Sequence, residues 1–143
     1  MVSRPLPYAV AKRGLWLVLA AAAACAGCDD GAEGQFIKAA SAHQFRSMVL
    51  ESPRPVMVEF YKSGCPGCSL AHPNLESVSE EYADRAGFVK VPREATEVRQ
   101  KYAITFYPTI FVFKGGKPVA RKTGPQPRSA YARMIDDHLS TPR

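Results

Sequence analysis

The sequence predicts a single α/β domain in which helices flank a mixed central sheet. Short apolar runs alternate with stretches whose apolar residues recur every three or four positions, which indicates alternating strands and helices and a parallel part of the sheet. Gly115-Gly116 separates the last two strand-like runs, which indicates a hairpin and an antiparallel edge. The 143 residues, 46% of them apolar, suffice for one domain with a packed core.

The elements are expected in the order β-α-β-α-β-α-β-β-α. Strands are predicted where short, mostly apolar runs are bounded by turn residues: 36–38, 56–61, 88–91, 109–113 and 118–122. Ser41 and Gln44 match a capping box and predict the start of the first helix, which Pro53 ends. Later helices are predicted after Cys68, over 96–102 and along the apolar stripe of Tyr131, Ile135 and Leu139.

Residues 1–27 have the three-part layout of a secretory signal peptide. Three basic residues precede Gly14, an apolar run of 12 residues extends from Leu15 to Ala26, and small residues follow. Because a bilayer-spanning helix needs about 20 residues, a cleaved signal is favoured over an uncleaved anchor. We therefore expect an exported protein.

Ala26-Gly27-Cys28 resembles the end of a bacterial lipoprotein signal. The resemblance implies cleavage before Cys28, lipid on that cysteine, and attachment to a membrane on the periplasmic side of the bacterial envelope. Ordinary cleavage nearby, which would release a soluble domain, stays open as an alternative. Residues 28–35 are polar and contain glycine, which predicts a flexible tether, and the folded domain is expected over 36–143.

The charge of the chain does not indicate a nucleic-acid partner. The formal net charge is +6, but removing residues 1–27 leaves 16 basic and 13 acidic residues. The remaining basic residues are scattered, whereas nucleic-acid binding needs a clustered basic patch. We expect no nucleic-acid partner.

The four cysteines form two Cys-x-x-Cys pairs, Cys25 with Cys28 and Cys65 with Cys68. The 36 residues between the pairs exceed the usual spacing of a four-cysteine zinc site, so the pairs are interpreted as unrelated and no metal site is predicted. Cys65 is expected where a strand passes into a helix, and the positive end of a helix dipole stabilises a thiolate there. Because the thiolate is the attacking species in disulfide exchange, Cys65 is expected to attack and Cys68 to resolve the mixed disulfide.

Further motifs around this pair resemble the thioredoxin superfamily. Val58-Glu59-Phe60-Tyr61, with Cys65 four residues on, is similar to that family's active-site strand and turn, and Pro73 to its helix-kinking proline. Tyr107-Pro108-Thr109 followed by the run to Lys117 is similar to its cis-proline loop, strand and hairpin. The resemblance extends from about Phe36 to Leu139 and implies the thioredoxin fold and thiol–disulfide exchange without a cofactor.

The resemblance also implies roles for individual residues. Pro108 would be a cis-proline facing the cysteine pair, and the backbone of Tyr107 would pair with an extended substrate segment. Glu59 would be a buried acid that accepts a proton from Cys68. The substrate surface would include Gly64, Pro66 and Gly67. Gly64 replaces the usual tryptophan, and the Pro-Gly order reverses the commonest dipeptide, so the direction of electron flow stays open.

Protein thiols and disulfides are the expected substrates, together with an upstream electron donor or acceptor protein. The reductase direction is slightly favoured over the oxidase or isomerase direction, because the overall motif set is thioredoxin-like. One alternative is a module that binds a soft metal such as Cu(I) through Cys65, Cys68 and His72. A second alternative is a catalytically inactive interaction domain of the same fold.

Four nearby residues allow structural as well as functional interpretations. Glu59 could be an ion-paired residue near a sheet edge, with Lys90 either its partner or a solvated residue at a strand end. His72 is expected to be an exposed helix residue rather than a metal ligand. Phe106 is expected to pack in the core.

Overall fold

The computed structural model describes residues 35–139, and the expectations for residues 1–34, including Cys25 and Cys28, lie outside the described residues. Within this range the strands are β1 (Ile37–Lys38), β2 (Val56–Tyr61), β3 (Gly87–Pro92), β4 (Thr109–Lys114) and β5 (Lys117–Thr123). They form one sheet in the order β1-β3-β2-β4-β5. The pairs β1–β3 and β2–β3 are parallel, whereas β2–β4 and β4–β5 are antiparallel, so the predicted mixed sheet is confirmed.

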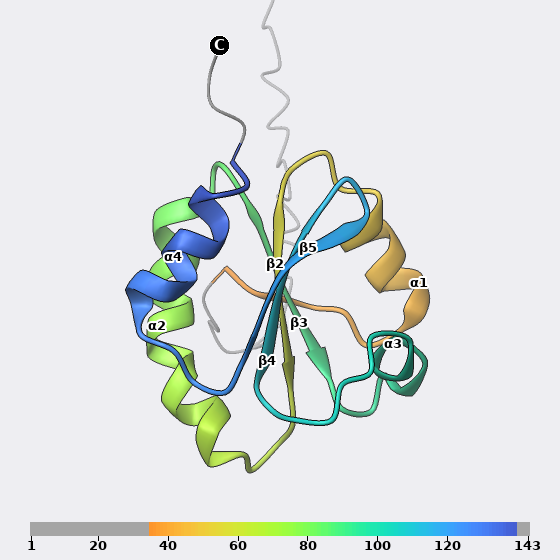
Figure 1. The fold of residues 1–143 in the computed structure, drawn as a ribbon. Coiled ribbons are helices and arrows are strands. Elements are labelled where there is room, and N and C mark those ends of the chain that lie inside the picture. Colours follow the sequence, from red (N-terminus) through yellow and green to blue (C-terminus); the bar gives the residue numbers. More distant parts are fainter. Residues whose placement is uncertain (1–34, 140–143) are drawn as a thin grey trace, which may run out of the picture.

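Helices cover both faces of this sheet. They are α1 (Ala42–Phe45), continued by the π-helical turn η1 (Arg46–Leu50), then α2 (Pro66–Tyr82), α3 (Thr96–Lys101) and α4 (Arg128–Asp136). In Figure 1 the sheet is seen nearly edge-on, with α2 and α4 on one side and α1 and α3 on the other. No helix within residues 35–139 combines the length and apolar character needed to cross a bilayer.

Local sequence signals explain several of these boundaries. Ser41 caps the helix as predicted, because Gln44 N donates to Ser41 Oγ over 3.2 Å. The Gln44 side chain reaches back one residue further than a capping box requires, since Gln44 Oε1 accepts from Ala40 N over 3.0 Å. The β4–β5 hairpin turns through Gly115 and Gly116, both with positive φ. A Cβ at Gly116 would lie 2.9 Å from the Leu50 carbonyl oxygen, so this turn requires glycine for space as well as for conformation.

The period-2 alternation of the strands builds two apolar layers, one on each face of the sheet. The layer under α1 and α3 combines valines and other aliphatic side chains with a group of four phenylalanines: Phe45, Phe60, Phe111 and Phe113. The layer under α2 and α4 includes Met57, Leu75, Val78, Phe88, Val112, Tyr131 and Ile135. Complete burial of a side chain such as Phe60 stabilises the fold by about 1.5–3 kcal/mol.

The same alternation brings one acidic residue to the α2 face. Met57 belongs to the layer under α2 and α4, so Glu59, two residues on, faces the same helices. β2 is the central strand of the sheet and Glu59 is only 5% exposed, so a position near an edge is wrong for this residue. Lys90 is its register partner on β3.

Candidate active site

The site begins where β2 ends and α2 starts. Gly64 has a φ of +68°, a left-handed conformation that lets the chain turn sharply before the helix. Cys65 is the N-cap of α2 and Pro66 occupies its first turn, where the missing N–H of proline costs no helical hydrogen bond. The Cys65 sulfur accepts a hydrogen bond from Cys68 N over 3.3 Å, so the thiol itself caps the helix.

Cys65 lies just beneath the surface. It is 6% exposed, while Gly64 and Pro66 on either side of it are exposed. Burial tends to raise the pKa of its thiol, but hydrogen bonds from the Cys68 side chain and from the Cys68 and Gly67 amides, together with the Lys62 charge, lower it overall. These groups stabilise the thiolate at the start of the helix, which is the attacking form in disulfide exchange.

Cys68 has the opposite properties. It is half-buried, and burial together with its hydrogen bond to the Cys65 sulfur raises the pKa of its thiol to about 12. The charges of Cys65 and Glu59 add to this increase. Both cysteines are free thiols in the structure. Because their environments move the two pKa values apart, Cys65 is suited to attack and Cys68 keeps its proton until a base removes it.

The loop before β4 lies across from the cysteine pair. The Tyr107–Pro108 peptide bond is cis, and Pro108 is buried. The Cys65 thiol donates to the Tyr107 carbonyl oxygen over 3.5 Å. A Cβ at Gly67 would lie 3.3 Å from Pro108 Cδ, so the start of α2 packs closely against this loop. The structure therefore brings Cys65, Gly67, Tyr107 and Pro108 together.

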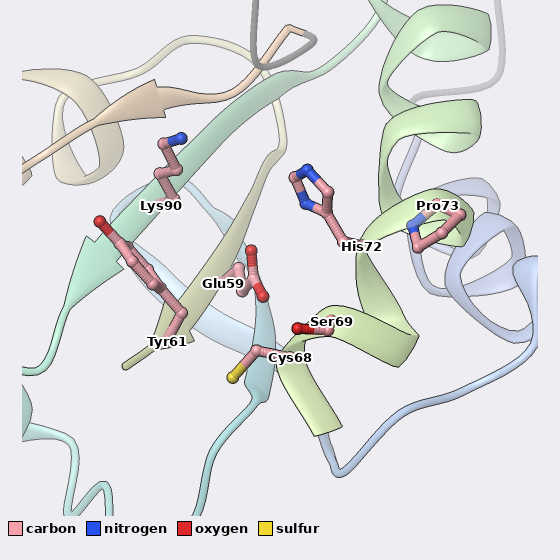
Figure 2. Close-up of a pocket in the computed structure, with 7 residues that line it drawn as sticks. All are labelled: Glu59, Tyr61, Cys68, Ser69, His72, Pro73 and Lys90. Atoms are coloured by element: carbon pink, nitrogen blue, oxygen red, sulfur yellow. The ribbon is translucent and has the colours of Figure 1, made fainter. Parts of the chain in front are cut away.

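A cavity of about 310 Å³ opens behind Cys68, between the first turns of α2 and the strands β2 and β3. Figure 2 shows the side chains that line it: Glu59, Tyr61, Cys68, Ser69, His72, Pro73 and Lys90. Burial raises the pKa of Glu59 to about 7. A carboxyl that titrates near neutrality and lines the same cavity as Cys68 is suited to accept the proton of that thiol.

Two neighbouring residues differ from the sequence-based expectations. Lys90 is 8% exposed rather than solvated, because its strand lies next to the central strand and its side chain lines the cavity beside α2. Burial lowers the pKa of Lys90. Phe106 was expected in the core, yet it is 67% exposed. Its carbonyl accepts a hydrogen bond from Thr109 Oγ1 over 2.8 Å in the turn that leads into β4, and its side chain lies outside both apolar layers.

Lys62 acquires significance only in the structure, and the structure places His72 at the cavity, a position that the sequence did not indicate. Lys62, three residues before the nucleophile, lowers the pKa of Cys65 by its charge. The feature of the sequence that could have indicated this role is the closeness of a basic residue to the first cysteine. His72 is half-exposed rather than fully exposed, and it reaches the cavity because it lies one helical turn after Cys68. Within residues 35–139, no three His, Cys, Asp or Glu side chains gather as a metal site would require.

Comparison with known proteins agrees with this geometry. The sequence model of the family described as Thioredoxin matches residues 36–137. The chain is 34% identical over 96 residues to thioredoxin 1 of Synechococcus elongatus, a match that covers 66% of this chain and 90% of that relative. It is 38% identical over 96 residues to thioredoxin C-2 of Corynebacterium nephridii, with coverage of 66% and 89%.

Among solved structures, the thioredoxin of Malassezia sympodialis superposes with a TM-score of 0.66 and 27% identity, covering 73% of this chain and 91% of that one. The expected fold is confirmed by this superposition and by the family match. The chain therefore belongs to the thioredoxin family of disulfide oxidoreductases.

Proposed function

We propose that the protein is an extracytoplasmic thiol–disulfide oxidoreductase that reduces disulfides in protein substrates through Cys65 and Cys68. One observation carries the proposal: the Cys65 sulfur caps α2, accepts the Cys68 N–H over 3.3 Å, and lies 3.5 Å from the Tyr107 oxygen in the proline loop. This arrangement provides a stabilised thiolate at Cys65 and a resolving thiol, Cys68, one turn further along the helix. It also places the backbone of Tyr107 beside the Cys65 sulfur.

The first step is the attack of the Cys65 thiolate on a substrate disulfide. The substrate S–S bond breaks, a mixed disulfide forms between Cys65 and one substrate sulfur, and the other substrate sulfur leaves as a thiolate that takes a proton from water. The groups that lower the Cys65 pKa raise the fraction of thiolate available for this attack. The backbone at Tyr107, a partly exposed residue beside Cys65, is suited to hold the substrate in an extended conformation.

The second step is the attack of Cys68 on the Cys65 sulfur. Glu59 accepts the Cys68 proton, the new Cys65–Cys68 disulfide forms, and the mixed disulfide breaks to release the second substrate thiolate. Two electrons thereby pass from the dithiol to the substrate. Since the pKa of Cys68 is about 12, this step depends on a nearby base, and Glu59 lines the same cavity.

The chain needs an upstream partner to complete a cycle. A reductase that has become oxidised must accept two electrons from a dithiol donor protein, whereas an oxidase would pass electrons to an acceptor. We favour the reductase direction because the family motifs are thioredoxin-like and the relatives named above are thioredoxins. No cofactor enters the proposed reaction.

The proposed location rests on the leader. Residues 1–27 resemble a signal peptide of lipoprotein type, and we propose that Cys28 carries the lipid that holds the domain on the periplasmic side of a bacterial membrane. Mass spectrometry of the mature N-terminus, with Cys28→Ser as the matched variant, tests this. Lipid on Cys28 and release of the variant from membranes are expected; an unmodified mature terminus beyond Cys28 would contradict it.

Insulin reduction with dithiothreitol tests the chemistry. The wild type should accelerate reduction, Cys65→Ser should abolish the acceleration, and Cys68→Ser should accumulate a mixed disulfide on Cys65. Equal activity of wild type and Cys65→Ser would overturn the enzyme proposal, and tight one-to-one Cu(I) binding by an inactive wild type would favour the metal-binding alternative. A redox potential near −270 mV would support a reductase, and one near −120 mV an oxidase, since these are the values of thioredoxin and of a strong thiol oxidant.

A further inference from the structure

The proton that Glu59 accepts has to leave a buried position. Glu59 is 5% exposed. In the proposed reaction, each oxidation of the dithiol transfers the Cys68 proton to the Glu59 carboxylate. Reduction by a donor requires the reverse transfer. A carboxyl that exchanged protons with bulk water only slowly would therefore limit turnover in either direction. The cavity behind Cys68 is the route by which the structure connects this carboxyl to the surface.

The titratable groups that face this cavity come from three elements. β2 contributes Glu59 and Tyr61, β3 contributes Lys90, and α2 contributes Cys68 and His72. Burial raises the pKa of Tyr61 and of Cys68, so at neutral pH both hold their protons, and Lys90 is itself buried. Imidazole is the side chain that ordinarily gains and loses protons near neutral pH.

His72 reaches both the cavity and the solvent. Its imidazole projects from α2 toward the space that Glu59 and Lys90 face, as Figure 2 shows, and its side chain is 42% exposed. His72 Nε2 lies 3.1 Å from Glu76 Oε1, one turn further along the helix. This contact with the Glu76 carboxylate orients the imidazole ring.

We propose that His72 is the proton-exchange residue of this site, moving protons between Glu59 and bulk solvent across the cavity. The inference rests on the proposed function and adds a residue to it. The cavity has room for several water molecules, at about 30 Å³ each, to bridge the gap between the two side chains. The proton leaves Glu59, neutral imidazole becomes imidazolium beside Glu76, and imidazolium then loses a proton to solvent; no electrons move in this transfer.

In this proposal His72 acts through Glu59 and does not touch the sulfur atoms. Its effect should therefore be confined to the second step, in which Cys68 attacks the mixed disulfide. The experiment follows substrate thiol release by stopped flow when the reduced protein reacts with a peptide disulfide in weakly buffered solution at pH 7. His72→Ala should slow release by about tenfold, less than the 10²–10⁴ of a group in direct contact with the reacting atoms. Attack by Cys65, measured in a Cys68→Ser background, should not change.

Rescue separates proton transfer from a structural effect. Added imidazole should restore the His72→Ala rate in proportion to its concentration and leave the wild-type rate unchanged. His43→Ala is the matched control, because His43 is exposed on α1 at the opposite face of the sheet, and its rate should equal that of the wild type. In a Glu59→Gln background, His72→Ala should have no further effect.

Two results would overturn the role of His72 while leaving the proposed function intact: a His72→Ala rate equal to that of the wild type, or a slowed rate that imidazole does not restore. A wild type that fails to react with the disulfide would instead overturn the proposed function, and this inference with it.

Discussion

The Cys65 sulfur lies 3.5 Å from the backbone oxygen of Tyr107, although 42 positions separate the two residues in the sequence. The contact joins the start of α2 to the loop that enters β4. A substrate segment that pairs with the backbone at Tyr107 is therefore brought beside the attacking sulfur. Measurable expectations follow for four residues near this contact: Lys62, Glu59, Gly64 and Phe106.

Replacing Lys62 should raise the pKa of Cys65. The Lys62 charge is one of the groups that lower it, so in Lys62→Gln less thiolate is present at pH 6. Alkylation of Cys65 by iodoacetamide at that pH should slow by about twofold, which corresponds to about 0.5 kcal/mol for a partly exposed charge pair. Lys101→Gln, on α3 at the other face of the sheet, serves as the control and should react like the wild type. Equal slowing in both variants would contradict a local effect of Lys62.

Glu59 should make the protein less stable as the pH rises. The folded-state pKa of about 7 exceeds the ordinary 4.5, so the native state binds more protons than the unfolded state between these values. The stability associated with the protonated carboxyl is complete below pH 4.5 and is lost as the pH rises through 7. Glu59→Gln, which cannot ionise, should match the wild type near pH 4 and exceed its free energy of unfolding by up to about 3 kcal/mol at pH 8.

Urea unfolding at several pH values measures this difference. Glu97→Gln is the control, because Glu97 is exposed in the first turn of α3, and its stability should follow the wild-type pH dependence. Parallel curves for the wild type and Glu59→Gln would show that the carboxyl is not protonated preferentially in the folded state.

Gly64 should be required for its backbone conformation. Its φ is +68°, and a Cβ there would meet nothing within 4 Å, so the cost of Gly64→Ala is conformational and not steric. The free energy of unfolding should fall by about 1–2 kcal/mol, the cost of the left-handed region for an L-residue. Gly64→Asn should lose less, since asparagine tolerates that region better. An alanine variant as stable as the wild type, measured by urea unfolding, would contradict this account.

Phe106 should contribute to the binding of protein substrates. It is 67% exposed and directly precedes Tyr107, so a polypeptide that pairs with this loop covers its ring. Phe106→Ala should raise KM for a protein disulfide by about fivefold, or about 1 kcal/mol, and leave stability unchanged. A small aromatic disulfide reagent should react at the wild-type rate.

The matched variant is Ile37→Ala, which removes another exposed apolar side chain, this one in the edge strand β1. Its KM should equal that of the wild type. A Phe106→Ala variant with unchanged KM would exclude the ring from the substrate surface.

Features set by nearby residues could be predicted from the sequence. The Ser41 cap, the glycine hairpin and the start of α2 at Cys65 each depend on a few consecutive residues, and the structure contains all three. Lys90 and Phe106 were harder to predict, because the burial of a side chain depends on which element covers it. A lysine in a strand is normally solvated, but here its strand neighbours the central one; a phenylalanine is normally buried, but here it occupies a turn.

The sequence by itself determined the alternation of strands and helices, the spacing of Cys65 and Cys68, and the presence of an acid in an apolar strand. Each is a local pattern that needs only the chemistry of consecutive residues. Only the tertiary structure decided that Tyr107 faces Cys65, that Glu59 shares a cavity with Cys68, and that His72 borders that cavity. These relationships depend on how β2, β4 and α2 pack, and packing joins residues whose separation along the chain carries no information about their distance in space.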